Sequence, residues 1–181
     1  MKRFGNVLIG VSLLGFGYTL LPIIQIYYFP KKIDINVVRK GEYITIPKIQ
    51  AQAQIIEQVD PWNEVVYKKA LTIGVAHAKD TALPGEKGTI FLFAHSSGLP
   101  WELTNNNAPF LRLNELRLGD RIEITKNGKV YVFAVTNKKE IQASEVQYIT
   151  KESKDNLILQ TCTPIGTSLR RLLIFAKLQA A

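Results

Sequence analysis

The stretch Asn156-Leu-Ile-Leu-Gln-Thr-Cys-Thr-Pro-Ile-Gly-Thr-Ser-Leu-Arg-Arg-Leu-Leu-Ile-Phe-Ala-Lys177 contains two apolar runs separated by a short loop. Each run is short and rich in residues that favour strands, so we predict strands over Asn156–Thr161 and Arg171–Lys177. The intervening segment carries Pro164 and Gly166, which are typical of loops. The end of the chain is therefore expected to form two neighbouring strands of a sheet.

Other segments of the chain show the same strand pattern. The clearest signal is Asn127-Gly128, a two-residue turn that favours a β-hairpin because both positions accept positive φ. We predict further strands at four places: Tyr43–Ile46, Thr89–Ala94, Arg121–Lys126 and Lys129–Thr136. Around seven or eight short strands in all indicate a β-barrel or a β-sandwich.

Two short helices are expected between these strands. Asn63–Leu71 has helical spacing of apolar residues, and Asp60-Pro61 stands where a cap and a first turn belong. Pro109–Leu116 suggests a second short helix. The chain has 181 residues, which fits one ordinary domain.

The first 29 residues are of a different kind. Residues 5–29 contain no charged side chain, and 25 residues are enough to cross a bilayer as a helix. We interpret this segment as a retained membrane anchor rather than a cleaved signal peptide or a buried core helix. We divide the chain into a tail (1–4), the anchor (5–29), a linker (30–41) and a folded domain (42–181). Basic residues flank the anchor on both sides, so the positive-inside rule leaves its orientation open.

Composition excludes several classes of protein. One cysteine cannot form an internal disulfide, and two histidines do not make a histidine-rich metal centre. The net charge is +8 with a pI near 9.6, but the basic residues are scattered without an aromatic platform or a known motif. Composition therefore gives no sign of a metal centre or a nucleic-acid partner.

Three residue types at strand ends point to chemistry. Cys162 follows one apolar strand, His95 follows another, and Arg170-Arg171 open the last strand. A thiolate can attack a carbonyl, an imidazole can protonate the leaving amine, and a guanidinium can support the oxyanion. Each residue alone has a structural explanation, but together they form a complete set for acyl transfer.

These residues resemble the sortase family. Leu159-Gln160-Thr161-Cys162 is similar to the TLxTC signature, and the loop and arginine-led apolar strand that follow have counterparts in the family. The family's stretch that ends in the catalytic histidine is similar to three segments here, Gly74–His77, Ala82–Gly88 and Phe93–His95. The family's first strand is similar to Tyr43–Ile49. The likeness spans about residues 42–178. Among sortases, the sequence is most similar to class D/E or class C-like members, but the resemblance does not determine the subclass.

The resemblance implies a fold and a set of roles. The fold is mostly β: a closed barrel of about eight strands with two or three short helices, preceded by one transmembrane helix. Cys162 is the implied nucleophile and His95 the general acid and base. Side chains alternate along a strand, so only one arginine can face Cys162, and the family's register selects Arg171. Arg170 is then a charge in solvent or at the rim of the substrate site.

Other positions are less specific. We consider Thr161 as a neighbour of bound substrate or as a strand residue that satisfies a backbone group, and Trp101 as a groove wall or a packed loop residue. His77 is expected to be structural. Asp60-Pro61-Trp62 has the form of the lid of pilus-building sortases but follows the first strand instead of preceding it, so we interpret it as the start of a helix.

The implied activity is that of a membrane-anchored cysteine transpeptidase, and the family resemblance implies no cofactor. Secreted proteins with a C-terminal sorting signal of LPXTG type would be cleaved through a thioester on Cys162 and passed to an amine of a cell-wall peptide or a pilin lysine. Localisation would be single-pass in the plasma membrane, with the domain outside the cytoplasm. A membrane-anchored thiol hydrolase with the same three residues, or a non-catalytic surface binding domain, remains the alternative.

Overall fold

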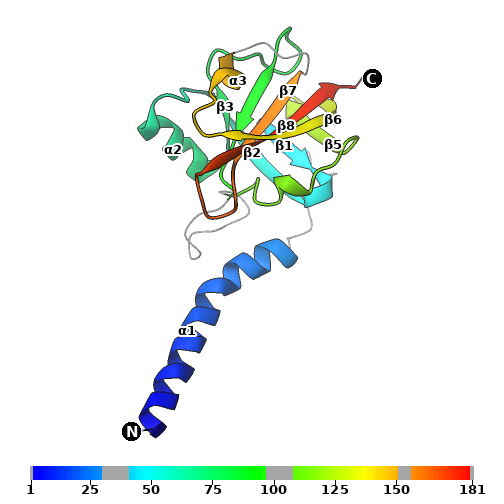
Figure 1. Cartoon of the computed structure of the whole chain (residues 1–181). Helices are drawn as coiled ribbons and strands as arrows, with labels where there is room; N and C mark the ends of the chain where they lie inside the picture. Colours follow the sequence, from blue (N-terminus) through cyan, green and yellow to red (C-terminus); the bar gives the residue numbers. More distant parts are fainter. Residues whose placement is uncertain (1, 30–40, 97–107, 151–155, 180–181) are drawn as a thin grey trace.

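The computed structural model describes residues 2–29, 41–96, 108–150 and 156–179. A long helix, α1 (Lys2–Tyr28), projects from one end of a β-barrel (Figure 1). The strands of the barrel are β1 (Tyr43–Ile46), β2 (Ala51–Val59), β3 (Val75–Ala78), β4 (Ile90–Phe93), β5 (Arg121–Lys126), β6 (Lys129–Gln142), β7 (Leu157–Thr163) and β8 (Arg170–Leu178). Between them lie the helices α2 (Glu64–Ile73) and α3 (Gln147–Thr150) and two 3₁₀ turns, η1 (Pro47–Ile49) and η2 (Leu113–Glu115). The predicted closed eight-stranded barrel with an N-terminal apolar helix is confirmed.

The strands close in the order β1-β2-β3-β4-β7-β8-β6-β5. Two neighbouring pairs are parallel, β2 with β3 and β4 with β7, and the others are antiparallel. A parallel pair requires a crossover connection, and α2 supplies it between β2 and β3. The β4–β7 pair is formed by segments far apart in the sequence, and it brings the chain after Phe93 beside the chain after Gln160.

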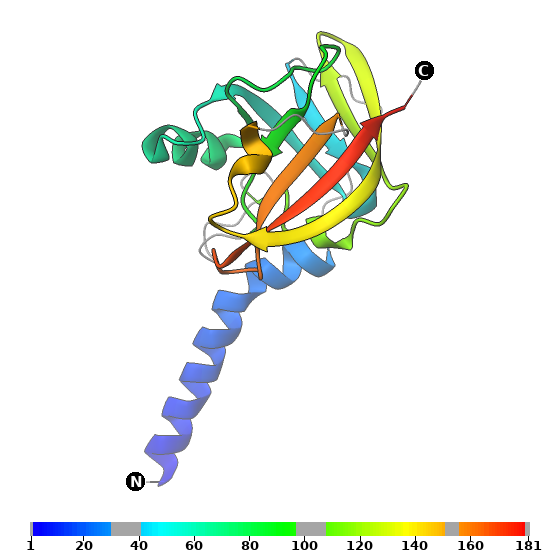
Figure 2. The same cartoon turned by 45° about the horizontal axis from the view of Figure 1, so that its top comes forward.

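Large apolar side chains fill the interior of the barrel. Phe110 and Phe133 are almost fully buried there, together with aliphatic residues of every strand. Two aromatic pairs also pack helices against the outer surface: Tyr67 of α2 lies edge-on to Phe93, and Tyr148 of α3 to Phe175. The helices α2 and α3 therefore flank the outer face of β4, β7 and β8 (Figure 2).

The predicted hairpin is confirmed, with Asn127 and Gly128 both at positive φ between β5 and β6. Two helix predictions need correction. Helix α2 begins at Glu64 and is capped by Asn63, whose Oδ1 accepts a hydrogen bond from the Val66 amide, rather than by Asp60. The helix expected over Pro109–Leu116 is only the three-residue turn η2, because the apolar side chains there fold into the barrel core.

Helix α1 carries an 18-residue apolar stretch, Phe4–Leu21, with a mean hydropathy of 1.6. None of this stretch is buried against the barrel. By length and composition it is a candidate membrane span. The barrel-side end of α1 touches the domain: Tyr27 packs against Ala108 and Leu111, and the Arg112 guanidinium lies 5.8 Å from the centroid of the Tyr27 ring.

Candidate active site

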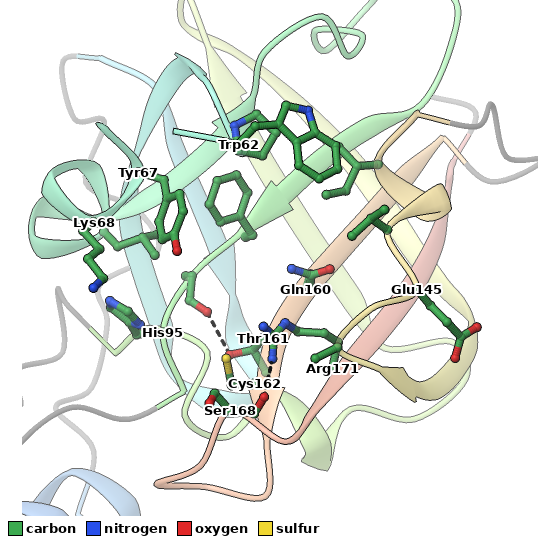
Figure 3. Close-up of a pocket in the computed structure, with 17 residues that line it drawn as sticks. Trp62, Tyr67, Lys68, His95, Glu145, Gln160, Thr161, Cys162, Ser168 and Arg171 are labelled. Atoms are coloured by element: carbon green, nitrogen blue, oxygen red, sulfur yellow. Dashed lines mark hydrogen bonds between the residues drawn. The ribbon is translucent and has the colours of Figure 1, made fainter. Parts of the chain in front are cut away.

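A cavity of about 310 Å³ opens on the outer face of β4, β7 and β8, between α2 and the segment around α3 (Figure 3). Its volume is at the lower end of the range typical for ligand pockets. The strands contribute its floor, including Phe93 and Gln160. The helices contribute its walls, including Tyr67 and Ile149. His95, Thr161, Cys162 and Arg171 all line this cavity.

Cys162 and Arg171 are brought together by strand pairing. In the antiparallel register of β7 and β8 they are direct partners, and directly opposed side chains share a face of the sheet. The guanidinium of Arg171 donates through Nη1 to the carbonyls of Ser168 and Arg170, at 2.9 and 3.2 Å. Among the described residues, its Nε and Nη2 have no hydrogen-bond partner.

Arg170 has a different environment. It pairs with Thr163 on the opposite face and lies 3.8 Å from a carboxylate oxygen of Glu140, with about half of its side chain exposed. Arg170 does not line either of the cavities beside Cys162. Its position agrees with a charge in solvent rather than with one at the thiol.

His95 follows β4 on the wall of the cavity nearest α2 (Figure 3). Burial lowers the pKa of His95 below its usual value, and the nearby Lys68 ammonium lowers it further. Within the described part of the chain, neither ring nitrogen has a hydrogen-bond partner. A neutral imidazole with free nitrogens can accept a proton from a thiol and return it to an amine.

Thr161 joins the two strands that carry His95 and Cys162. Its hydroxyl is buried and donates a 2.8 Å hydrogen bond to the carbonyl of Ala94. The Ala94 amide in turn donates to the carbonyl of Gln160 at 3.1 Å. The structure thus gives Thr161 the backbone-satisfying role, although its side chain also borders the cavity.

His77 lies elsewhere. It is 1% exposed, its Nδ1 accepts from the Gln58 amide at 3.5 Å, and its Nε2 lies 3.0 Å from the carbonyl of Ala82. Burial lowers the pKa of His77 as well. These contacts fit the structural role expected for it. Trp101 lies outside the described residues.

The cavity walls include Lys68 and Glu145, which were not singled out from the sequence, and Trp62, which was interpreted there as part of a helix start. Trp62 is 59% exposed at the rim, where an Asp60 carboxylate oxygen accepts a 2.9 Å hydrogen bond from its amide. Lys68 of α2 and Glu145, which precedes α3, bring opposite charges to opposite walls (Figure 3). The tripeptide Asp60-Pro61-Trp62 therefore both leads into α2 and borders the cavity.

Cys162 also lines a second cavity, of about 350 Å³. It is lined by Phe110, Leu111 and Ile165 and by the polar Ser96 and Asn114, among others. The Ser96 hydroxyl is buried and has no hydrogen-bond partner in the described residues. Cys162 thus lines both cavities.

A closed eight-stranded barrel with Cys, His and Arg in one outer cavity defines a candidate cysteine acyl transferase. Comparison with known proteins identifies the family. The sortase domain model matches residues 44–179, and the chain belongs to the sortase family.

Individual relatives agree with this assignment. The chain is 29% identical over 138 residues to sortase D of Bacillus subtilis (strain 168), covering 74% of this chain and 61% of that protein. It is 23% identical over 131 residues to sortase A of Bacillus anthracis, covering 72% and 56%. The chain thus spans about three fifths of the curated relatives that it matches.

Solved structures show the same fold. Sortase C-1 from Actinomyces oris superimposes with a TM-score of 0.64 at 26% identity, covering 77% of this chain and 74% of that one. A sortase D5 transpeptidase of Clostridium perfringens superimposes with a TM-score of 0.61 at 23% identity, covering 77% and 79%. The similar proteins carry class names A, C and D, so they leave the subclass of this chain open.

Proposed function

We propose that this protein is a membrane-anchored cysteine transpeptidase that acts on LPXTG-like sorting signals. The observation that carries the proposal is that Cys162, His95 and Arg171 line one cavity on a sortase barrel. The candidate span in α1 supports a single-pass anchor in the plasma membrane with the barrel outside the cytoplasm. Secreted proteins with a C-terminal sorting signal are the proposed substrates.

The first half-reaction forms a thioester. His95 takes the thiol proton of Cys162, and the sulfur attacks the carbonyl of the signal's Thr–Gly bond. The free donors of Arg171 support the negative charge that develops on the carbonyl oxygen. The C–N bond then breaks, and the imidazolium of His95 gives its proton to the leaving amine.

The second half-reaction transfers the acyl group. An amine of a cell-wall peptide or a pilin lysine attacks the thioester, His95 accepts the amine proton, and the sulfur leaves and recovers a proton as Cys162. Water in place of the amine gives hydrolysis. The proposed reaction needs no cofactor, because the thiol, imidazole and guanidinium supply every proton and charge.

The decisive experiment compares the chain with Cys162→Ala. Peptides carrying LPXTG-like signals are incubated with and without an added amine such as hydroxylamine, and products are identified by mass spectrometry. We expect an amine adduct for the unchanged chain and no product for Cys162→Ala, with both folded by circular dichroism. Hydrolysis that ignores the amine would identify a thiol hydrolase, and full activity of Cys162→Ala would refute the assignment.

A further inference from the structure

The loop between β7 and β8 presents two apolar side chains to solvent. Ile165 is 45% exposed and Leu169 69%. The loop is held in shape, because the amide and hydroxyl of Thr167 donate to the Pro164 carbonyl at 3.0 and 2.9 Å. Gly166, at φ +82, supplies the positive φ of this turn, so Ile165 stands at a fixed tip.

This loop lies at the end of the barrel that faces α1. Leu111 packs with Tyr27 of α1, and the same Leu111 lines the second cavity together with Ile165. Figure 1 and Figure 2 both place the β7–β8 loop on the α1 side, while the C-terminus at the other end of β8 lies far from α1. A membrane that holds α1 would therefore be on the side of Ile165 and Leu169.

The loop and the residues that follow it carry basic but no acidic side chains, although Glu140 of the neighbouring strand β6 lies 3.8 Å from Arg170. No aspartate or glutamate occurs from residue 156 to the end of the chain, and Arg170 and Arg171 follow the loop directly. The linker of residues 30–41 contains four basic residues and one acidic residue. Apolar side chains beside basic ones are the combination that binds the interface of an anionic bilayer.

Single exposed apolar residues are common on protein surfaces and by themselves indicate nothing. Leu118, for example, is 71% exposed. What distinguishes Ile165 and Leu169 is that they share one ordered, acid-free loop at the end of the barrel where the anchor is attached.

We propose that the β7–β8 loop is a second membrane contact, which places Ile165 and Leu169 in the headgroup region of the anionic lipid surface that holds α1. The inference rests on the proposed membrane anchor. Cys162 lines the same cavity as Ile165, so this contact holds the thiol close to the bilayer surface. Substrates or acceptors that are themselves tethered to the membrane then meet the thiol at a high effective concentration.

The test uses the full chain in vesicles. Cys162 is the only cysteine, so Cys162→Ala leaves a background in which Leu169→Cys can carry an environment-sensitive fluorophore. Leu178→Cys is the matched control, because Leu178 is 44% exposed at the opposite end of the same strand β8. The vesicles contain phosphatidylcholine with or without phosphatidylglycerol, plus lipids that carry a nitroxide near the headgroup.

We expect the probe at position 169 to be quenched several-fold more than the probe at position 178, and more strongly with phosphatidylglycerol. Equal, weak quenching at both positions, in vesicles that flotation shows to carry the chain, would overturn the contact. Equal quenching of the position-169 probe with and without phosphatidylglycerol would overturn the anionic surface as its partner. A chain that does not float would refute the anchor and the contact together. The readout needs no catalysis, so none of these outcomes depends on the transpeptidase assignment.

A second measurement uses the chain with Cys162 in place. Leu169 lines neither cavity, so Leu169→Ser should leave kcat/KM for a soluble peptide in detergent unchanged. In vesicles with a membrane-inserted substrate, the same variant should lose several-fold in rate, whereas Leu178→Ser should not. Unchanged transfer by Leu169→Ser in vesicles would contradict a role of the loop at the membrane.

Discussion

The hydroxyl of Thr161 donates a 2.8 Å hydrogen bond to the carbonyl of Ala94, and each of these residues immediately precedes a proposed catalytic residue. Thr161 leads to Cys162 on β7, and Ala94 leads to His95 after β4. The bond is buried, and it supplements the backbone pairing of two strands that are distant in sequence. It joins the backbone of β7 just before Cys162 to the backbone just before His95.

Thr161→Val should therefore lower both stability and rate. The substitution keeps the shape of the side chain but removes a buried hydrogen bond, which is worth about 1–2 kcal/mol in the free energy of unfolding. Misplacing His95 relative to Cys162 can cost up to ~100-fold in kcat/KM. Thr161→Ser retains the hydroxyl and should recover most of the rate. Chemical denaturation and kcat/KM on one peptide test this, and a fully active, fully stable Thr161→Val would contradict it.

The alternation of side chains along β8 predicted that only one of the two arginines faces Cys162, and the resemblance to the sortase family selected which one. Arg170 and Arg171 were expected to face opposite sides of the sheet, with Arg171 on the side of Cys162. The pairing of Arg171 with Cys162 agrees with that choice. Arg171→Ala should lose ~10²–10³-fold in kcat/KM, as removal of an oxyanion donor does. Arg170→Ala, which removes only a distant pair with Glu140, should cost little. The reverse order of the two losses, with both variants folded by circular dichroism, would show that Arg170 serves the site.

Much of the barrel could be predicted because strands are encoded locally. Asn127-Gly128 fixes a hairpin by itself, and the apolar runs of β4, β7 and β8 are short and bounded by loop residues. The parallel pairing of β2 with β3 was not foreseen, because it depends on how α2 packs between them. The helix predicted over Pro109–Leu116 is only the short turn η2, because the apolar residues of this segment pack into the barrel core.

The strand ends of the site could also be predicted, but its walls could not. Cys162, His95 and Arg171 carry chemistry that is visible in the residue types. Trp62 and Lys68 belong to segments that look like an ordinary exposed helix start. They border the cavity only because α2 packs against Phe93 through Tyr67, a tertiary contact with no local signal.

The two histidines offer a matched pair for mutation. His95→Ala should lose ~10²–10⁴-fold in kcat/KM with the fold retained, because it removes the proposed acid and base. His77→Ala should instead reduce the free energy of unfolding by about 1–3 kcal/mol, since it leaves the Gln58 amide and the Ala82 carbonyl without their buried partner. Activity per folded molecule should persist in His77→Ala. Comparable catalytic loss in both folded variants would place His77 in the mechanism.

The final prediction concerns the charge that Lys68 brings to the wall beside His95. The titratable and charged side chains that line the cavity with His95 include Lys68 of α2, Cys162 of β7, Arg171 of β8 and Glu145 before α3. A nearby positive charge disfavours the protonated imidazole, so Lys68 adds to burial in lowering the pKa of His95. Lys68→Met should raise the pKa of His95, and the limb of the kcat/KM profile that reports His95 should move to higher pH.

Two controls make this result specific. Lys69→Met removes a neighbouring lysine that does not line the cavity and should leave the profile in place. At 1 M salt the Debye length falls to about 3 Å, so the profile of the unchanged chain should shift toward that of Lys68→Met, which should itself move little. The measurement is kcat/KM against pH for the three chains at low and high salt. A profile that stays fixed in Lys68→Met, or moves to lower pH, would show that Lys68 does not act on His95 through its charge.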